Sequence, residues 1–416
     1  MSLARAFTLS NGIRMPYVGL GTYRVRDQAT LETCLLEALQ AGYRLIDTAS
    51  VYRNEAAIGH SLKRILEQNL VPGLTRQDIF LTSKLAPKDQ GYDACLQAVE
   101  ESLKNLQVDY IDLYLIHWPG TAKLKLPDPQ NAINRTESWR ALEDLYHARK
   151  LRAIGVSNYT LKHLTELVER PLQTHQHQLA SAAGHTTVQD QLSSSLSSSP
   201  AGLLDNAHGH ARTMVIPHVH QFELHPRLFQ RDLVEYCKNH RIQVQAYSSL
   251  GEGRLVSLTP PPPPPMDAHY NNTPMPGALD IMPDLIRKYF SVSQDQSKLS
   301  GQDMDPQSIQ RTWAIPSDDM EGVITTSSTT KATNNDNRSD VEISQSEYTR
   351  RSAQILLRWG LQHGAVVIPK STHPERIRNN IDLFSFEIDM ADMNALDAYS
   401  MQGERTRYCW DPTDVF

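Results

Sequence analysis

Short apolar runs recur along the chain, and each is separated from the next by a segment with helical periodicity. The runs are rich in β-branched side chains and almost continuously apolar, which is typical of strands that are buried on both faces. Eight of them lie at residues 17–20, 45–46, 79–81, 110–116, 153–156, 219–224, 242–247 and 365–368. Because strands that alternate with helices pair in parallel, the pattern predicts an α/β protein with a parallel sheet.

Leucine and isoleucine at spacings of three or four residues mark the helices between these strands. Clear examples lie at residues 31–39, 58–66, 96–106, 142–146 and 355–359, and a shorter one lies at 281–290. Eight strand–helix units favour a closed (β/α)8 barrel, the TIM barrel. An open, doubly wound sheet is the alternative.

Three low-complexity segments interrupt this pattern, at residues 171–213, 259–279 and 294–347. Segments so poor in apolar residues cannot offset their own ordering entropy, so we expect disordered loop insertions in a single barrel domain that spans residues 1–416. The first precedes the sixth strand, and the other two follow the seventh. A lid over the site and a retained intron are alternatives, but plain surface loops are favoured because polar sequence of this kind lacks anchors.

The composition excludes several classes of protein. The chain carries 41 Lys and Arg against 47 Asp and Glu, a net charge of −6, which argues against nucleic acid or an anionic membrane as a partner. Four cysteines without a CxxC pair exclude a disulfide framework and a zinc ribbon. The chain has neither an apolar run of about 18 residues nor a signal-peptide core. We therefore expect a cytoplasmic protein with a small-molecule partner.

Histidines are frequent in the first insertion and in the strand after it, and they form three His-x-His pairs. Alternate residues of a strand face one way, so the pair His218 and His220 has a spacing that suits a metal. However, no cysteine or carboxylate pattern completes such a site, and we expect no bound metal.

Polar, titratable side chains follow three of the predicted strands, at the carboxyl ends where a (β/α)8 barrel places its active site. Asp47 ends the second strand and Tyr52 lies in the next loop, Lys84 ends the third strand, and His117 follows the fourth. Because such groups are costly in a core when unpaired, we expect them to share one pocket. Asp47 and Lys84 alone would fit a structural ion pair, but Tyr52 and His117 beside them favour a catalytic group.

A phenol beside an ammonium group can act as an acid. The reference pKa of tyrosine is about 10, and we expect Lys84 to lower the pKa of Tyr52 by favouring the phenolate. Asp47 would keep Lys84 charged and in place, while His117 would orient a carbonyl oxygen. This set suits protonation of an oxygen that becomes negative, as in the reduction of a carbonyl by hydride.

Three motifs in the same order resemble the signatures of the aldo-keto reductases. The run GYRLIDTA at residues 42–49, with Tyr52 and Gly59 after it, resembles the first signature. Residues 142–159, which end in IGVSNY, resemble the second, and IPKS at residues 368–371 resembles the third. The resemblance covers almost everything outside the insertions. It implies a TIM barrel, usually monomeric, that reduces aldehydes and ketones with NADPH.

Position by position, the resemblance implies that Asp47, Tyr52, Lys84 and His117 are catalytic and that Tyr52 is the acid. It implies a binding site for the cofactor NADPH along the strand ends and loops, formed by Gly21, Thr22, Ser157, Asn158, Gln221, Tyr247, Ser248, Leu250, Lys370, Ser371, Arg376 and Asn380. Lys370, Ser371 and Arg376 would hold the 2′-phosphate, which suits a guanidinium fork and an ammonium point charge. Tyr23, His117 and Trp118 would line the substrate pocket.

Two positions depart from the family pattern: Asn379 lies where the third signature usually carries Glu, Gln or Ser, and Tyr23 lies where many members carry Trp. The tail after Met401 is short, which predicts an open pocket for small or varied carbonyls. Two alternatives to an active reductase stay open. One is an NADPH-binding regulatory or scaffold subunit with weak or no turnover, and the other is a barrel whose insertions disrupt the cofactor site.

Overall fold

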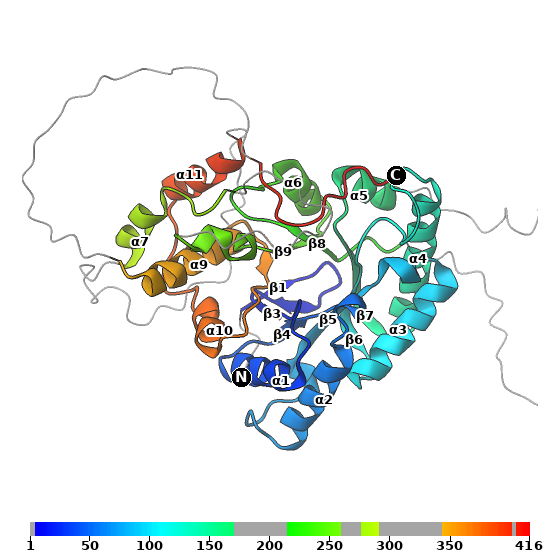
Figure 1. Ribbon diagram of the computed structural model, residues 1–416. Coiled ribbons are helices and arrows are strands. Elements are labelled where there is room, and N and C mark those ends of the chain that lie inside the picture. Colours follow the sequence, from blue (N-terminus) through cyan, green and yellow to red (C-terminus); the bar gives the residue numbers. More distant parts are fainter. Residues whose placement is uncertain (1–4, 170–213, 259–275, 291–342, 402–404) are drawn as a thin grey trace, which may run out of the picture.

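The computed structural model describes residues 5–169, 214–258, 276–290, 343–401 and 405–416. These residues form an eight-stranded parallel sheet with helices around it (Figure 1). The expected insertion at residues 171–213 lies outside the described residues, as does most of each of the other two.

The sheet is the barrel that the sequence predicts. Neighbouring strands pair in parallel and in chain order: β3 (Gly19–Gly21), β4 (Leu45–Asp47), β5 (Phe80–Leu85), β6 (Ile111–Ile116), β7 (Leu151–Ser157), β8 (Val219–Glu223), β9 (Gln243–Tyr247) and β10 (Val366–Val367). A parallel bridge joins Val18 to Val367, and the amide of Val367 donates to the carbonyl oxygen of Tyr17 at 3.0 Å. The first and last strands therefore meet, so the (β/α)8 prediction is confirmed and the doubly wound alternative is wrong.

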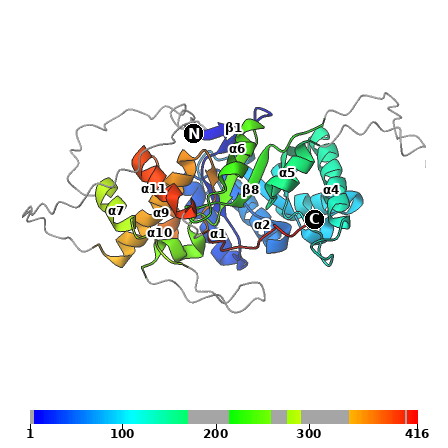
Figure 2. The ribbon, with the colours of Figure 1, turned by 90° about the horizontal axis from the view of Figure 1, so that it is seen from above.

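Helices surround the sheet (Figures 1 and 2). They are α1 (Gln28–Gln40), α2 (Glu55–Glu67), α3 (Tyr92–Leu106), α4 (Gln130–His147), α5 (Leu161–Val168), α6 (Arg231–Asn239), α7 (Met282–Phe290), α9 (Gln345–Gln362), α10 (Pro374–Ile381) and α11 (Met390–Met401). In the described part of the chain, none of them has the length and apolar character needed to cross a bilayer.

The strands and helices form because their apolar side chains share a core. All residues of β5 and β6 are buried, as expected for strands with helices on one face and the barrel interior on the other. In α2, Ile58, Leu62 and Ile65 repeat with helical spacing and are buried on one face. Asp27 caps α1 by accepting a hydrogen bond from the amide of Thr30 at 2.8 Å.

A hairpin that the sequence patterns did not indicate precedes the barrel. Strands β1 (Ala6–Thr8) and β2 (Arg14–Pro16) pair antiparallel. Asn11, in the turn between them, donates from Nδ2 to the carbonyl oxygen of Arg152 at 3.0 Å. Since Arg152 is at the start of β7, the hairpin lies at the amino end of the strands, opposite the face where the active site is expected.

The described ends of two expected insertions belong to the folded part. Leu279 is buried, and α9 begins at Gln345, inside the insertion expected to end at residue 347, with Ser344 accepting the amide of Glu347 at 3.2 Å as its cap. The second and third insertions, which were expected to end at residues 279 and 347, were therefore drawn too long at these ends. The reason is that Ser, Gln and Glu, which look like low-complexity sequence, are also the residues that begin helices.

Candidate active site

The register of β4 and β5 brings two charged side chains together at the carboxyl end of the barrel. Asp47 is paired with Thr82, and Lys84 follows Thr82 by two residues, so all three side chains project from the same face of the sheet. Asp47 and Lys84 are almost completely buried. Buried charges require partners, and each of these residues has several.

Lys84 has an acceptor for each of its three N–H groups. Its Nζ lies 2.5 Å from Oδ1 of Asp47, 2.8 Å from the carbonyl oxygen of Thr48 and 3.4 Å from the phenol oxygen of Tyr52. Three donated bonds match an ammonium group. Because the phenol oxygen accepts from Lys84, the proton of Tyr52 is left for donation to another group.

Asp47 is also held from across the barrel. Gln221, on β8, donates from Nε2 to Oδ2 of Asp47 at 2.7 Å and to Oε1 of Gln245 at 2.9 Å. Both oxygens of Asp47 thus accept strong donors, which fits a carboxylate.

Burial and charge shift the pKa values of Asp47 and Lys84 in opposite directions. Burial raises the pKa of Asp47, and the ammonium group of Lys84 counteracts it. Burial lowers the pKa of Lys84, and the carboxylate of Asp47 counteracts it. The hydrogen-bond set, with three acceptors around Nζ and donors on both carboxylate oxygens, indicates the charged pair.

A rigid turn carries Tyr52 to this pair. Tyr52 ends the 3-10 turn η1 (Ser50–Tyr52), and Arg53 follows it in a left-handed conformation with φ 58°. Asn54 then donates from Nδ2 to the carbonyl oxygens of Thr22, at 3.0 Å, and Val25, at 2.9 Å. The loop after β4 is therefore tied to the loop after β3, and the phenol has little freedom to move away from Lys84.

The expectation for the acidity of Tyr52 was wrong in direction. Burial raises the pKa of Tyr52 well above its usual value, and the carboxylate of Asp47 raises it further. The expectation considered Lys84 alone and omitted desolvation, which disfavours a phenolate. The phenol is therefore fully protonated near neutral pH, which is the form that an acid needs.

His117 completes the group at the end of β6. Its ring lies edge-on to that of Tyr52, with the centroids 5.6 Å apart. Burial lowers the pKa of His117 well below its usual value, and the nearby Lys84 lowers it further, so the imidazole is neutral. Nδ1 of His117 is buried without a hydrogen-bond partner among the described residues.

The ends of β7 and β9 place further expected residues beside His117. Asn158 takes a left-handed conformation with φ 61°, and its Nδ2 donates to the carbonyl oxygen of His117 at 2.9 Å and to Oγ of Ser157 at 3.1 Å. Tyr247 donates from its hydroxyl to Oδ1 of Asn158 at 2.7 Å. Ser157, Asn158 and Tyr247 are thus joined in one hydrogen-bonded network that contacts the backbone of His117.

Gly21 and Thr22 lie against the barrel wall rather than in open space. A Cβ on Gly21 would lie 2.8 Å from the carbonyl oxygen of Ile368, so no side chain fits there. Thr22 is buried and donates from Oγ1 to the carbonyl oxygen of Asp47 at 2.9 Å. In the structure, both residues support the loop that holds Asp47.

The loop after β9 turns sharply. Ser248, Gly251, Glu252 and Gly253 all have positive φ, between 49° and 90°. Leu250 lies within this turn and is half-buried against the core. The amides of Gly251 and Gly253 donate within the turn, to the carbonyl oxygens of Ser248 at 2.8 Å and Leu250 at 3.0 Å, and the cofactor contacts expected of Ser248 and Leu250 stay predictions.

The residues expected around the adenosine phosphate follow β10. Lys370 and Arg376 are exposed. Ser371 is buried and accepts the amide of His373 at 3.1 Å, while Asn380 is buried on α10. Lys370 and Arg376 therefore both lie on the part of the chain that follows β10, near the start of α10.

Aromatic side chains lie beside Tyr52 and His117, where the sequence predicts the substrate pocket. Tyr23 is exposed, and its ring centroid lies 5.1 Å from that of Tyr52. Trp118, next to His117, packs edge-on against Trp410, with the centroids 6.0 Å apart. The sequence predicted Tyr23 and Trp118 but missed Trp410, because the expectation of a short, open tail gave it no position near the pocket. The aromatic run Tyr408-Cys409-Trp410 was the available signal.

Comparisons with known proteins identify the relatives of this chain. The model of the aldo/keto reductase family matches residues 17–189 and 192–400. A glyoxal reductase of Bacillus subtilis is 30% identical over 397 residues, which cover 95% of this chain and 93% of that protein. A 9,11-endoperoxide prostaglandin H2 reductase of Trypanosoma cruzi is 28% identical over 409 residues, which cover 98% of this chain and 95% of that protein.

Solved structures agree in fold. An aldo-keto reductase from a deep-sea metagenome library has a TM-score of 0.61 at 27% identity, covering 99% of this chain and 100% of the other. A Bombyx mori aldo-keto reductase in complex with NADP has a TM-score of 0.59 at 24% identity, covering 99% and 96%. The resemblance drawn from the three motifs is confirmed.

Proposed function

Because this chain belongs to the aldo-keto reductase family and is an oxidoreductase, we propose that it reduces aldehydes and ketones to alcohols with NADPH, with Tyr52 as the proton donor. One observation carries the proposal: Nζ of Lys84 lies 3.4 Å from the phenol oxygen of Tyr52 while it is paired with Asp47 at 2.5 Å. A structural ion pair has no need of a phenol at its open side.

The residues present fit NADPH. Tyr247 is half-buried at the end of β9, where its ring can support a planar nicotinamide, and Asn158 beside it carries an amide suited to a carboxamide. Lys370 and Arg376 are exposed cations on one connection, and they suit the charge of a 2′-phosphate. The alternative cofactor NADH lacks that phosphate, so the pair favours NADPH.

Bound NADPH supplies the hydride that reduces the carbonyl carbon. The chain's own residues handle the oxygen. Tyr52 donates its proton to the oxygen as negative charge develops there, and the phenolate left on Tyr52 is stabilised by the ammonium of Lys84. Asp47 keeps Lys84 charged and fixed during the transfer.

His117 orients the carbonyl. A neutral imidazole has one N–H donor, and a hydrogen bond from it to the carbonyl oxygen fixes that oxygen near Tyr52. Because the low pKa of His117 keeps the imidazole neutral, its single N–H donates a hydrogen bond, and no imidazolium competes with the phenol as the acid.

The substitution Tyr52→Phe tests the assignment, because it keeps the ring and removes the proton. We expect the rate of aldehyde reduction to fall about 10²- to 10⁴-fold, the usual contribution of a general acid. NADPH binding, measured by quenching of protein fluorescence, should stay within about threefold of wild type because Tyr52 is not among the proposed cofactor contacts.

Tyr236→Phe is the matched control. Tyr236 lies on α6, outside the group around Lys84, so the loss of its hydroxyl should leave reduction unchanged. Full activity of the Tyr52→Phe protein on a panel of aldehydes, ketones and sugars would show that another group is the acid.

A further inference from the structure

The C-terminal tail (residues 405–416) crosses the carboxyl end of the barrel. In Figure 1 it is the dark red trace that passes β8 and ends beside α5. One side chain of the barrel holds the start of this tail, and several others hold its end. Between these anchors the tail carries Trp410, which packs on Trp118 of the expected substrate pocket.

Glu223, the last residue of β8, is the anchor at the start. Its side chain is completely buried. Oε1 accepts the amide of Tyr408 at 2.6 Å, and Oε2 accepts the amide of Cys409 at 3.1 Å. His225 lies 3.0 Å from Oε1 through Nε2, and Arg407 lies 4.0 Å from Oε2.

A carboxylate is the group that these contacts require. Two consecutive backbone amides donate to different oxygens of the same side chain, and a carboxylate presents an acceptor to each. A buried carboxylate is stable only when it is hydrogen-bonded or paired, and the two tail amides supply donors beside His225. The tail and Glu223 therefore depend on one another.

The tail also packs on the loop after β9. A Cβ on Gly251 would lie 2.9 Å from the ring of Tyr408, so this glycine allows the ring to approach closely. Sγ of Cys409 lies 3.2 Å from Oγ of Ser248. The segment held by Glu223 is thus adjacent to the proposed cofactor loop.

The end of the tail has its own anchors. The carbonyl oxygen of Val415 lies 2.8 Å from Nε2 of His163, and the amide of Phe416 donates to the carbonyl oxygen of Leu126 at 2.8 Å. Arg135 donates to the carbonyl oxygen of Phe416. A Cβ on Gly120 would lie 3.3 Å from both Val415 and the indole of Trp118, so the tail end and the pocket wall touch at this glycine.

We propose that Glu223 is a positioning residue that sets substrate selectivity. By holding the amides of Tyr408 and Cys409, it fixes Trp410 against Trp118 as one wall of the pocket, and this wall favours apolar, aromatic carbonyl compounds. The inference rests on the proposed reductase function. Glu223 itself contacts neither Tyr52 nor Lys84 in the hydrogen bonds of the site, so its effect passes through the tail.

The experiment compares Glu223→Gln with the wild-type full-length protein in the presence of NADPH. Glutamine replaces one of the two acceptor oxygens with an NH2 group, which cannot accept the amide that faces it. For naphthaldehyde we expect kcat/KM to fall roughly three- to tenfold, mainly through KM, since an aromatic contact is lost. For propanal, which is too small to reach the wall, kcat/KM should stay within about twofold.

Hydrogen exchange gives a readout that does not depend on turnover. In the wild-type protein, the amides of Tyr408 and Cys409 should exchange more slowly than those of Asp411 and Asp414, and Glu223→Gln should abolish the difference. Trp410→Ala should reproduce the loss for naphthaldehyde while both amides stay protected.

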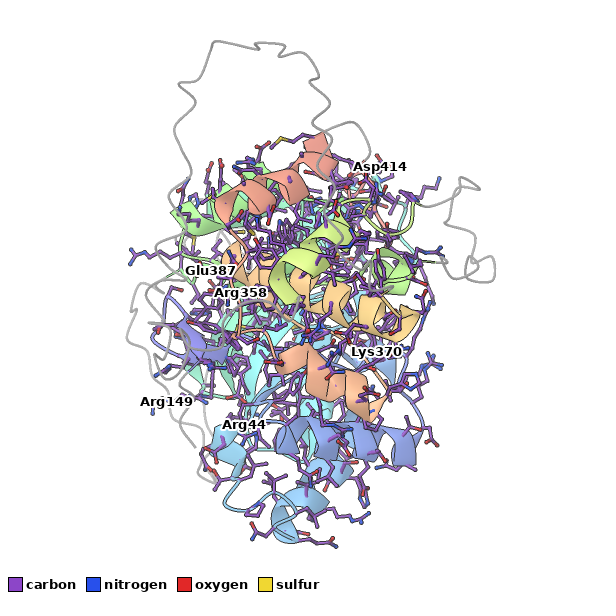
Figure 3. All side chains as sticks on the ribbon, turned by 90° about the vertical axis from the view of Figure 1, so that its left-hand side faces the viewer. Arg44, Arg149, Arg358, Lys370, Glu387 and Asp414 are labelled. Atoms are coloured by element: carbon purple, nitrogen blue, oxygen red, sulfur yellow. The ribbon has the colours of Figure 1, made fainter. Side chains whose placement is uncertain are left out.

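Asp414→Asn is the control, since it removes an exposed charge from the same tail. Figure 3 shows Asp414 well away from Lys370 of the proposed phosphate site. An equal fall for both aldehydes in Glu223→Gln, or fast exchange of the Tyr408 and Cys409 amides in the wild type, would overturn the proposal. Absence of turnover combined with slow exchange would refute the reductase function and leave the anchoring role of Glu223 intact.

Discussion

At the scale of single residues, the site depends on how one lysine distributes its three donors. Two of the acceptors around Lys84, Asp47 and the carbonyl of Thr48, are fixed parts of the barrel, and only the third, Tyr52, faces the open side. The fixed acceptors hold the ammonium group in one position. The phenolate of Tyr52, when it forms, therefore meets a charge that needs no reorganisation.

The raised pKa of Tyr52 predicts the pH dependence of reduction. Burial and the charge of Asp47 place this pKa above 10.0, so the phenol keeps its proton as pH rises through the neutral and moderately alkaline range. The value of kcat/KM for propanal should therefore be flat from about pH 6 to about pH 9 and fall only at higher pH. Steady-state rates across this pH range measure kcat/KM, and a fall in kcat/KM with an apparent pKa near 7 would contradict the prediction.

The ion pair between Asp47 and Lys84 predicts that substitutions of these two residues have coupled effects on the free energy of unfolding. Lys84→Met leaves a buried carboxylate without its cation, so the free energy of unfolding should fall by about 3–5 kcal/mol. The double substitution Asp47→Asn with Lys84→Met removes both charges and should lose less than the sum of the single substitutions, by about 0.5–3 kcal/mol. Urea unfolding measures all four proteins of the cycle. Additive losses would mean that the two charges do not stabilise each other.

At the scale of elements, α10 provides an internal comparison of two arginines. Arg376 is exposed near the start of the helix, in the position proposed for the 2′-phosphate. Arg378, two residues later, forms an ion pair with Glu37 of α1. One helix therefore holds an arginine available to a cofactor and an arginine with a structural partner.

Arg376→Ala should weaken NADPH binding and leave NADH binding nearly unchanged. A hydrogen bond to a charged group contributes about 1.5–3 kcal/mol, so the Kd of NADPH should rise about 10- to 100-fold. Fluorescence titration with NADPH and with NADH measures the Kd of each nucleotide in the variant and in the wild-type protein. Arg378→Ala should change neither Kd by more than about threefold, because an exposed ion pair adds little. Equal losses for the two nucleotides would refute the assignment of the phosphate site.

The elements also show which parts of the fold the sequence predicts. All eight barrel strands were expected, because burial on both faces leaves a continuous apolar run in each. The hairpin β1–β2 was missed, since each of its short strands includes an exposed polar residue, Thr8 or Arg14, and neither forms a continuous apolar run. Helix α9 was expected too short because its first turn is polar and resembles the segment before it.

The residues of the site likewise divide into those that the sequence predicts and those that it does not. Asp47, Lys84 and His117 could be located because each directly follows an apolar strand, and strand ends are local features of the sequence. Trp410 could not, because the hydrogen bonds that place it join the tail to Glu223, more than 180 residues earlier in the chain. The aromatic run at residues 408–410 marks the tail as a candidate, but no local pattern predicts its contact with Glu223.

At the scale of the whole molecule, the described residues close the barrel among themselves. The bridge between Val18 and Val367 joins the two ends of the sheet. The parts of the chain that flank the segments are also anchored. Lys288 on α7, for example, pairs with Asp389 and Asp392 near the start of α11.

We therefore expect a chain in which residues 170–213 and 291–342 are each replaced by a Gly-Ser linker of about a dozen residues to bind NADPH and reduce propanal within about threefold of the full-length protein. Loop closure depends only logarithmically on length, so the free energy of unfolding should rise by about 1 kcal/mol per replacement. Fluorescence titration, NADPH oxidation and urea unfolding measure the three quantities. A folded variant that no longer binds NADPH would place part of the cofactor site in those segments. Full-length protein that binds NADPH without turnover, and that loses a bound partner when residues 291–342 are replaced, would instead establish the regulatory or scaffold function.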